Sequence, residues 1–529
     1  MCGIAVAIDW EDAHAHVQRL IGDVLHRGDI SDHIATPRAN VAMGTRRLRI
    51  VDAAHGAQPQ PSFDGKLLVS FNGEIYNHLA LRAELEAMGI GFRTGSDTEV
   101  LANALRAWGA QALKRLRGMY AFVAYDVTNG EFLAARDPFG VKPLYLVQAG
   151  TGFLFCSEIR PLLKAAGTGD VMLLPPGHLL TRNFCTRFYT LPAPTQLGAS
   201  SSDALDKILR EAVESRLPPD LPVAGLFSGG IDSTLMMHYA RRIRPEMPGY
   251  FIGEPDAPDY KYARAYAEQT GMDMREVTPP PRGAGMLALL RTVVEICESF
   301  EPSVVRPGLY SYLVSERIHR DGFRVALCGE GADELFAGYG PLEHTFAQGN
   351  TLGRHVQEQC LSFMHRANLQ RVDRCSMRFE LEIREPFLDL NLVEHAAQLD
   401  ATALLAMVDG RPQGKQPLRA IYDLYPDALP REIRNRRKVQ FDEGAGIASE
   451  RTDWTAMFED AVSDRDFADG RRQFAAYDIA TKEELYYMRA LAAAMDVGRL
   501  PHLKGRIRLC VPADTPAMPE ALKRLAPSV

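Results

Sequence analysis

The stretch VAGLFSGGIDSTLMMHYARRI, residues 223–243, joins a short apolar run to an amphipathic run through a turn with two adjacent glycines. The apolar run predicts a buried strand, and the spacing of Leu235, Met236 and Tyr239 predicts a helix. Glycines let the backbone wrap around an anion, while the N-terminus of a helix directs unpaired amides toward it. This order, with Asp232 inside the turn, favours a phosphate-binding loop over a merely flexible turn.

Alternating strand and helix patterns surround this stretch. A helical pattern begins at the potential cap Ser202 or Asp203, and RVALC, residues 324–328, is a second apolar run that leads into a glycine-rich turn. Such alternation predicts an α/β domain with a parallel sheet covered by helices. After about residue 345 the patterns are mostly helical and end in a proline-interrupted tail.

The first part of the chain is richer in strands. MYAFVAYD and EFLAARD are joined through Asn129-Gly130, a dipeptide that accepts the positive φ values of a tight hairpin, so these strands should pair antiparallel. Helices are expected near residues 79–88 and from Ser96, which has capping-box spacing to Glu99. The segment LPAPTQLGASSS, residues 191–202, has two prolines and no periodicity, which indicates a linker between domains.

Composition excludes several functions. The chain has 529 residues, 46% of them hydrophobic and 24% charged, and its net charge of -7 gives no basic field for nucleic acid or an anionic membrane. No apolar run approaches the roughly 18 residues of a membrane span, and the N-terminus lacks the positive charge of a signal peptide, so a cytoplasmic location is expected. The eight cysteines show no CxxC spacing, so neither a zinc site nor a disulfide framework is expected.

Cys2 is a candidate nucleophile. Removal of the initiator Met1 would place a free α-amine beside its thiol. An α-amine titrates at about 7.7 to 8.0, so its neutral form can take the thiol proton near physiological pH. Taken alone, Cys2 is better explained as a small buried hydrophobic residue.

Five segments in order reverse that interpretation. They are MCGIAVAI (1–8), HRG (26–28), RLRIVD (47–52), FNGEIYN (71–77) and GSDTEV (95–100). Together they resemble the class II glutamine amidotransferase domain. The resemblance covers about the first 190 residues and implies an N-terminal-nucleophile (Ntn) fold, an αββα sandwich of two antiparallel sheets between helices. The family's usual HRGPD is HRGDI here, which leaves the conformation around Asp29 open.

The resemblance assigns roles in glutamine hydrolysis. Attack of the Cys2 thiolate on the carboxamide creates an oxyanion, which the Asn72 side chain and the Gly73 amide would stabilise. Arg47 would bind the α-carboxylate of glutamine, because a planar guanidinium suits a carboxylate. The remaining contacts are assigned to two carboxylates and two backbone positions: Asp97, Glu74, Ile50 and Val51. On spacing alone, Asp97 would be explained as a favourable charge in the first turn of a helix.

The turn at residues 228–233 resembles the SGGxDS loop of ligases that cleave ATP to AMP and pyrophosphate, and it differs from the GxxxxGK[ST] loop of γ-phosphate transfer. The residues that this resemblance assigns to ATP are Phe227, Ser228, Gly229, Gly230, Asp232, Ser233, Ile252, Cys328 and Gly329. Asp232 and Asp333 lie in different loops and are the candidate ligands of Mg²⁺, with substrate phosphates completing its coordination.

CGEGADE, residues 328–334, is similar to the SGEGSDE segment of asparagine synthetases. The family's glutamate takes part in forming the acyl-adenylate, and Glu330 occupies its place. The alternative for this acidic cluster is a solvated loop, which is most plausible for Glu334.

Further segments extend the resemblance over nearly the whole chain: Arg306 in SVVRPG, PFLD (386–389), GKQPLR (414–419) and RRKVQF (436–441). Lys438 would stabilise charge on the departing pyrophosphate. Without the family, the neighbouring arginines would favour a solvated basic run. Glu385 stands where an apolar residue is common, and its effect is left open.

The resemblance implies an enzyme that uses glutamine and ATP to convert aspartate into asparagine through β-aspartyl-AMP. One alternative is another acceptor acid in specialised metabolism, and a second is a non-catalytic regulatory protein on the same scaffold. Amidotransferases that act on sugar phosphates or phosphoribosyl compounds share only the first domain. A chain with both sites gains by passing ammonia internally, so a tunnel and cross-talk between the sites are expected. The resemblance also implies a homodimer.

Four regions are therefore expected along the chain. They are a glutaminase domain (2–190), a linker (191–202), an ATP-dependent domain (203–515) and a tail (516–529).

Overall fold

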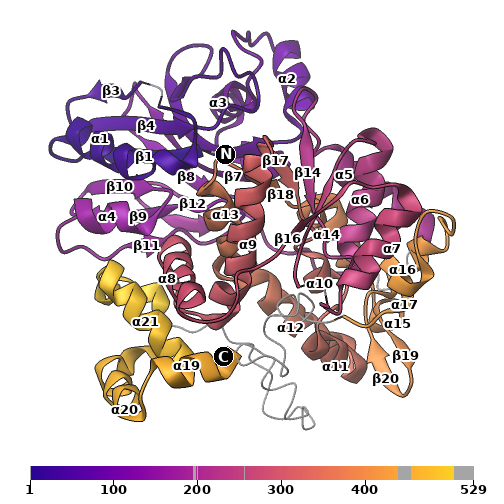
Figure 1. Ribbon diagram of the computed structural model, residues 1–529. Coiled ribbons are helices and arrows are strands. Elements are labelled where there is room, and N and C mark those ends of the chain that lie inside the picture. The colour runs from indigo at the N-terminus through magenta and orange to yellow at the C-terminus, as the bar shows by residue number, and fades with distance from the viewer. Residues whose placement is uncertain are drawn as a thin grey trace. The chain divides into compact units, whose positions relative to one another are not determined.

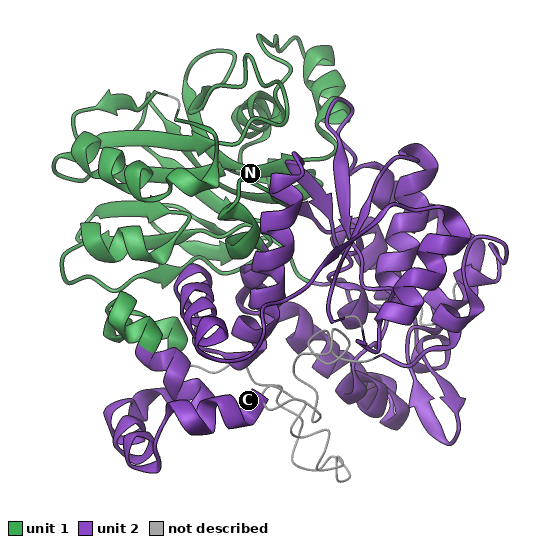
Figure 2. Cartoon of the chain, viewed as in Figure 1, with its two compact units in different colours: residues 1–190, 373–382, 490–505 green, residues 191–372, 383–489, 506–529 purple. Residues whose placement is uncertain are grey.

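The computed structural model describes residues 2–31, 33–194, 198, 201–254, 256–438 and 454–504. The chain divides into two compact units (Figure 2). Unit 1 consists of Met1–Thr190, Asp373–Glu382 and Ala490–Gly505; unit 2 consists of Leu191–Val372, Ile383–Arg489 and Arg506–Val529. Two short segments from late in the sequence are therefore part of the first unit.

Unit 1 contains two antiparallel sheets (Figure 1). In the first sheet the strand order is β11-β9-β10-β1-β4-β2, with β3 beside β4: β1 (Cys2–Ile8), β2 (Ile30–Ser31), β3 (Ala35–Arg38), β4 (Val41–Arg47), β9 (Tyr145–Ala149), β10 (Gly152–Cys156) and β11 (Met172–Leu173). In the second sheet the order is β13-β12-β8-β7-β6-β5: β5 (Gln60–Pro61), β6 (Leu67–Ile75), β7 (Gly118–Asp126), β8 (Phe132–Arg136), β12 (His178–Leu180) and β13 (Cys185–Arg187).

The two sheets pack face to face. Ile4 and Met43 of the first sheet share one buried cluster with Val123 and Tyr125 of the second. Helices α1 (Ala13–Asp23) and α4 (Ile159–Ala165) pack on the first sheet, while α2 (His78–Ala87) and α3 (Asp97–Trp108) lie over the second. This layering confirms the predicted αββα sandwich.

Local predictions in unit 1 also hold, with one correction. β7 and β8 pair antiparallel through a turn in which Gly130 has φ of 81°. Ser96 caps α3, because its Oγ accepts a hydrogen bond from the Thr98 nitrogen at 3.1 Å. The prediction of a capping box is wrong in one respect. The Glu99 carboxylate does not return a hydrogen bond to the Ser96 backbone, because it accepts hydrogen bonds from the backbone nitrogens of Arg93 and Thr94.

Unit 2 is built on a sheet with the strand order β16-β15-β14-β17-β18: β14 (Val223–Leu226), β15 (Gly249–Ile252), β16 (Met274–Val277), β17 (Val325–Leu327) and β18 (Glu382–Arg384). Neighbouring strands from β16 to β17 pair in parallel. Helix α6 (Ile231–Ile243) packs on β14, and α9 (Pro302–Arg320) packs on β15 and β16. These elements confirm the predicted α/β fold with a parallel, helix-covered sheet.

The remaining helices surround this sheet or follow it in the chain. Helix α5 (Ser202–Glu214) is capped by Ser201, one residue before the expected cap. The others are α7 (Tyr260–Thr270), α8 (Ala284–Cys297), α10 (Ala332–Leu335), α11 (Gly340–Gln348), α12 (Asn350–Phe363), α13 (Asn368–Met377), α14 (Leu390–Ala396), α15 (Ala401–Leu404), α16 (Gln416–Tyr422), α17 (Arg431–Asn435), α19 (Trp454–Ala461), α20 (Asp464–Gln473) and α21 (Lys482–Ala494).

The mostly helical reading after residue 345 is confirmed, although β19 (Ala406–Val408) and β20 (Arg411–Gln413) form an unforeseen hairpin. The expected tail, 516–529, lies outside the described residues. None of the described helices has both the length and the hydropathy of a membrane-spanning segment.

The strand order of unit 2 marks a place for a ligand. From β14 the chain proceeds to β15 and β16 on one side, and β17 then returns to the other side of β14. Ligands of open α/β sheets bind at the carboxyl ends of the two strands where the order reverses. The loops after β14 and β17 are the two glycine-rich turns that the sequence singled out.

Candidate functional site

The nucleophile candidate lies at the start of β1 in unit 1. Cys2 stands directly opposite Arg47 of β4, and its backbone nitrogen donates a hydrogen bond to Asn72 Oδ1 of β6 at 2.8 Å. Only 5% of Cys2 is exposed, and this burial raises the pKa of its thiol to about 11. A thiol with that pKa needs a base beside it to act near neutral pH. Met1 lies outside the described residues.

Asn72 and Gly73 occupy positions that β6 fixes tightly. Asn72 is fully buried, and its Nδ2 has no hydrogen-bond partner within the described chain. A buried amide without a partner costs free energy, which a ligand oxygen would recover. Gly73 has φ of 152°, and a Cβ there would lie 2.0 Å from the Met119 oxygen, so only glycine fits. The arrangement leaves one donor unused beside the thiol.

The glutamine-binding candidates lie around this strand end. The Arg47 guanidinium donates to the Ala53 backbone oxygen at 3.1 Å, which orients it from the loop that contains Ile50 and Val51. In the first turn of α3, Asp97 Oδ2 accepts a hydrogen bond from the Ile75 nitrogen at 3.0 Å, one residue beyond the buried Glu74. Asp97 is buried, and burial raises its pKa. Asp97 therefore connects α3 to β6 as well as beginning the helix.

The HRGDI segment, which the sequence left open, runs beside β4. Asp29 accepts a hydrogen bond from Arg49 Nε at 2.8 Å, and the Asp29 nitrogen donates to the Arg47 oxygen at 3.0 Å. Ile30 then pairs with Arg47 in the β2–β4 ladder. Asp29 thus forms an ion pair with Arg49, and the backbone of residues 29 and 30 is held against Arg47 of β4.

In the first glycine-rich turn of unit 2, serine hydroxyls accept hydrogen bonds from the backbone of the same turn. The Ser228 nitrogen donates to Ser233 Oγ at 3.2 Å, and the Gly230 nitrogen donates to Ser228 Oγ at 3.3 Å. Gly229 has φ of 67°, and a Cβ there would lie 2.5 Å from the Ala263 nitrogen. The turn leads directly into α6, so hydroxyls and helix amides gather where an anion would bind.

The second glycine-rich turn lies against the first. A Cβ on Gly329 would meet the Asp232 Cβ at 3.2 Å. Lys415 Nζ lies 2.5 Å from Asp232 Oδ2 and 2.5 Å from Asp333 Oδ1, while Lys438 Nζ lies 3.0 Å from Asp333 Oδ2. The structure therefore brings together the two aspartates that the sequence placed in separate loops.

Burial and the two lysines set the charges of these aspartates. Burial opposes ionisation of Asp333, but Lys415 and Lys438 outweigh it and lower its pKa to about 2. At Asp232 burial, together with the neighbouring charge of Asp333, outweighs the attraction of Lys415 and Lys438 and raises the pKa of the carboxyl. The pKa of Lys438 is raised by Asp333 and Asp232 against the effect of burial, which keeps the ammonium charged.

The same carboxylates fit a divalent cation. Asp232 Oδ1 is buried and has no hydrogen-bond partner among the described residues. Carboxylate oxygens suit Mg²⁺, which keeps several waters and takes phosphate oxygens as further ligands. The described residues contain no group of three His, Cys, Asp or Glu placed around one metal position. Two aspartates with phosphate oxygens are thus the set that this site offers.

Glu330 is held by one helix. Arg371 Nη2 donates to Glu330 Oε1 at 2.7 Å, and Asn368 Nδ2 donates to Glu330 Oε2 at 2.7 Å. Glu334 corrects the interpretation as a solvated loop, because it is only 3% exposed and accepts a hydrogen bond from Tyr339 at 2.9 Å. Burial, with Asp333 and Glu330 nearby, raises the pKa of Glu334 to about 8.

Three apolar candidates for nucleotide binding are buried at the carboxyl ends of neighbouring strands. Phe227 directly follows β14, Ile252 is the last residue of β15, and Cys328 directly follows β17. Their positions suit contacts to a nucleotide bound at these strand ends.

Other matched segments have structural partners. Arg306 pairs with Glu483 of α21 through two contacts, of 2.7 Å and 2.5 Å.

The PFLD segment and the residue before it have structural roles. Asp389 of PFLD caps α14, and Glu385, which directly precedes the segment, is buried. The basic run beside Lys438 is not simply solvated, because Arg436 is buried and donates to the Gly229 oxygen at 3.0 Å. Residues 439–441 of RRKVQF lie outside the described residues.

Several residues of these sites had no assigned role in the sequence. Lys415 lies in the GKQPLR segment, which matches the family but was given no function. The sequence therefore pointed to this segment without indicating what Lys415 does. Asn368 and Arg371 lie in no recognisable motif, and only the fold brings them to Glu330.

Two family descriptions match this chain. A glutamine amidotransferase domain matches residues 1–176, and asparagine synthase matches residues 204–360 and 347–500. By class the chain is therefore a glutamine-dependent amidotransferase.

Named relatives cover nearly the whole chain. A probable glutamine-hydrolysing asparagine synthetase of Schizosaccharomyces pombe is 31% identical, with 93% of each chain covered. Asparagine synthetase 1 of Saccharomyces cerevisiae is 30% identical over 92% of each chain, and asparagine synthetase B of Escherichia coli is 29% identical over 85% of this chain and 83% of its own. The chain belongs to the family of glutamine-hydrolysing asparagine synthetases.

Proposed function

We propose that this protein makes an amide from a carboxylic acid, with aspartate as the leading acceptor, at the expense of glutamine and ATP. Cys2 would release ammonia from glutamine in unit 1. Unit 2 would activate the acid as an acyl-AMP, release pyrophosphate and let ammonia displace AMP. The proposal combines the residues around Cys2 with those around Lys415, and each set has the groups that its reaction needs.

Glutamine hydrolysis would begin at the Cys2 sulfur. After removal of Met1, the neutral α-amine would take the thiol proton, and the thiolate would attack the carboxamide carbon. Asn72 Nδ2, buried and without a partner in the described chain, would donate to the developing oxyanion together with the Gly73 amide. Collapse of the tetrahedral intermediate releases ammonia with the proton from the amine. Water then hydrolyses the thioester to glutamate and free thiol.

Acid activation would take place at the two glycine-rich turns. A carboxylate oxygen of the acceptor attacks the α-phosphorus of ATP, and pyrophosphate departs. Lys415 and Lys438 would stabilise the negative charge that shifts onto pyrophosphate. Mg²⁺ bound by Asp232 and Asp333 would neutralise phosphate charge.

Ammonia then attacks the acyl carbon of the adenylate, and AMP leaves as the amide forms. The attacking nitrogen must lose a proton in this step. Glu330, held in place by Arg371 and Asn368, is our candidate to guide that nitrogen and receive the proton.

The observation that carries the proposal is the bridge from Lys415 to Asp232 and Asp333, at 2.5 Å to each. A non-catalytic scaffold has no need for two charged groups from separate loops at the strand ends where a nucleotide would bind. Buried charges are costly unless they are paired, so a chain without this activity would be expected to lose them.

A purified enzyme would test the proposal directly. We expect incubation with glutamine, ATP, Mg²⁺ and a panel of amino and carboxylic acids to give equal amounts of AMP, pyrophosphate and one amide, with aspartate the best acceptor. Formation of ADP and phosphate would reject the adenylate. An amide formed only from a different acid would keep the chemistry and replace the acceptor.

A further inference from the structure

The strand that carries Cys2 is anchored by a buried arginine. Arg27 is fully buried, and its Nε donates to the Cys2 backbone oxygen at 3.1 Å. The other two nitrogens of this guanidinium donate to both carboxylate oxygens of Asp373, each at 3.0 Å, and one also donates to Glu158 at 3.1 Å. All three guanidinium nitrogens of Arg27 therefore donate hydrogen bonds, and two of them donate to Asp373.

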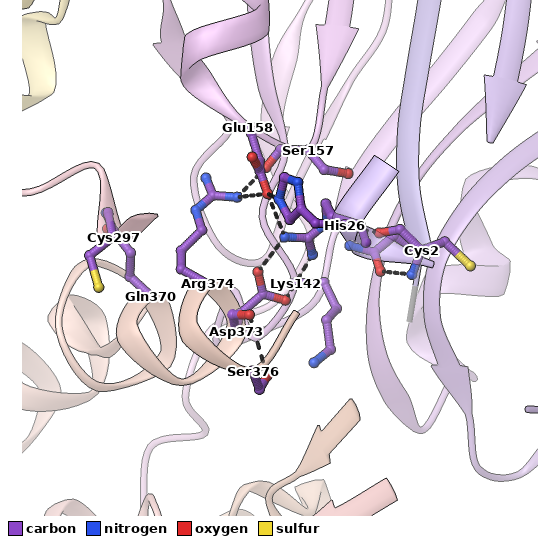
Figure 3. Close-up of polar contacts among 12 residues, drawn as sticks. Cys2, His26, Lys142, Ser157, Glu158, Cys297, Gln370, Asp373, Arg374 and Ser376 are labelled. Carbon is purple, nitrogen blue, oxygen red and sulfur yellow. Dashed lines mark hydrogen bonds and ion pairs between the residues drawn. The ribbon is translucent and has the colours of Figure 1, made fainter. Parts of the chain in front are cut away.

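Asp373 is part of unit 1 although it lies 346 residues after Arg27. It is 3% exposed; burial opposes its ionisation, but Arg27 and Lys142 lower its pKa. Figure 3 shows the Asp373 side chain near those of Lys142 and Arg374, both of which help to lower its pKa. A bidentate, buried ion pair of this kind fixes orientation as well as charge.

The next residue holds the same strand at a second point. Arg374 Nη1 donates to the Ser157 oxygen at 2.7 Å. The Ile4 nitrogen donates to Ser157 Oγ at 3.0 Å, and the Ser157 nitrogen donates to the Ile4 oxygen at 3.2 Å. Asp373 and Arg374 thus position β1 through Arg27 at Cys2 and through Ser157 at Ile4.

Both residues belong to α13, whose first half makes a different set of contacts. Asn368–Val372 is part of unit 2, where Asn368 and Arg371 hold Glu330 at 2.7 Å each. The second half, from Asp373, is part of unit 1. One helix of ten residues therefore holds the carboxylate of the proposed acyl-transfer site in one unit and the nucleophile strand in the other.

We propose that α13 is a coupling helix, and that Asp373 is a positioning residue through which the state of Glu330 changes the reactivity of Cys2. The inference rests on the proposed function for the role of Glu330. When acceptor and nucleotide engage Glu330, its bonds to Arg371 and Asn368 change, and the first turn of α13 moves with them. A helix transmits such a shift along its length, so the Asp373–Arg27 pair moves and Cys2 is repositioned.

A test without substrates measures how fast iodoacetamide alkylates Cys2 in Glu330→Gln, Asp373→Asn and the double variant. Coupling free energies between sites are commonly equivalent to about 5- to 150-fold. We expect Glu330→Gln alone to change the Cys2 rate at least about 5-fold and to have almost no further effect once Asp373 is replaced. The exposed Cys185 should react at the same rate in every variant, which controls for misfolding. Independent, multiplicative effects of the two substitutions would overturn the proposal, as would no effect of Glu330→Gln.

A second measurement separates this inference from the proposed function. Glutamine hydrolysis is measured with and without ATP and acceptor, alongside ammonia-dependent AMP formation. Wild type should be stimulated, Asp373→Asn should lose most of the stimulation, and both should form AMP from ammonia at similar rates. Gln370→Ala, which loses only a hydrogen bond of α13 to the Cys297 oxygen, should keep the stimulation. Absence of AMP in wild type would reject the proposed function alone, because the alkylation experiment does not depend on it.

Should Asp373→Asn fail to fold, Arg27→Lys replaces it in both measurements. Lysine keeps the charge but cannot bridge Cys2 and Asp373 as the three nitrogens of arginine do. We expect the same loss of coupling, and full coupling in this variant would overturn the proposal.

Discussion

Asn72 Oδ1 accepts a hydrogen bond from the Cys2 nitrogen at 2.8 Å, while the other end of the same amide, Nδ2, has no partner among the described residues. The oxygen of the Asn72 amide thus binds the Cys2 backbone, and the nitrogen of the same amide could donate to a ligand. This division of roles can be tested by separating the two ends of the amide.

Asn72→Ala removes both ends, whereas Asn72→Asp keeps an oxygen for the Cys2 nitrogen and replaces the donor with a second carboxylate oxygen, which can only accept when ionised and adds negative charge. We expect both variants to lower kcat for glutamine hydrolysis by roughly 10² to 10³, the usual effect of losing one oxyanion donor, with little change in KM. AMP formation from ammonia should remain at the wild-type rate. Wild-type kcat in Asn72→Asp would show that the donor has no part in the reaction.

Retention of Met1 should inactivate glutamine hydrolysis. In the uncleaved chain the Cys2 nitrogen is an amide and cannot accept a proton, and burial raises the pKa of the thiol to about 11. Protein produced without methionine aminopeptidase should hydrolyse glutamine at less than about 1% of the mature rate. Treatment of the same sample with the aminopeptidase should restore activity, and mass spectrometry gives the fraction processed. Equal activity before and after cleavage would exclude the α-amine as the base.

Lys415→Met should separate the two activities. The variant leaves the buried carboxylates of Asp232 and Asp333 without the ammonium that bridges them, so AMP formation should fall at least about 100-fold. Its melting temperature should be lower than that of wild type in EDTA and should rise more on addition of Mg²⁺. Glutamine hydrolysis in the absence of ATP should be unchanged.

Lys207→Met is the matched control for this substitution. Lys207 is largely exposed and lies 3.9 Å from Glu211, and such surface pairs contribute little to stability. It should match wild type in all three measurements. A Lys415→Met enzyme that still forms AMP normally would remove Lys415 from the proposed site.

The sequence predicted most of what is local in this fold. The 223–243 stretch predicted β14, its turn and α6, because glycine spacing and helical periodicity are properties of adjacent residues. Asn129-Gly130 predicted the β7–β8 hairpin for the same reason. The αββα layering and the roles of the glutamine-binding residues came through resemblance to a family, whereas the phosphate-binding loop that contains Asp232 was predicted from the order of strand, glycines and helix.

Contacts between distant segments were beyond the reach of the sequence. Nothing near Arg27 indicates that Asp373 pairs with it, because the pair depends on how a late segment packs into unit 1. A solvated loop was the alternative interpretation of Glu334, yet Glu334 is buried and accepts a hydrogen bond at 3.3 Å from Asn368, which lies 34 residues further along the chain. Charge alone does not reveal burial when the neighbours that satisfy it are far away in the chain.

His238 should make the stability of unit 2 depend on pH. It is 8% exposed on α6, and its ring centroid lies 4.6 Å from that of Tyr425. Burial and Arg242 lower its pKa to about 4, against the opposing effect of Asp206. The folded protein therefore keeps His238 neutral where an unfolded chain, with an ordinary pKa near 6.5, takes up a proton.

It follows that His238 leaves stability unaffected above about pH 6.5, and that stability is lost as the pH falls from there toward about 4. The full difference corresponds to about 3 kcal/mol. His238→Gln cannot take up this proton, so its melting temperature should fall less than that of wild type between pH 8 and pH 5. His14→Gln, at an exposed position, should follow wild type. The same pH dependence in His238→Gln and wild type would mean that His238 is protonated as readily in the folded protein as in the unfolded chain.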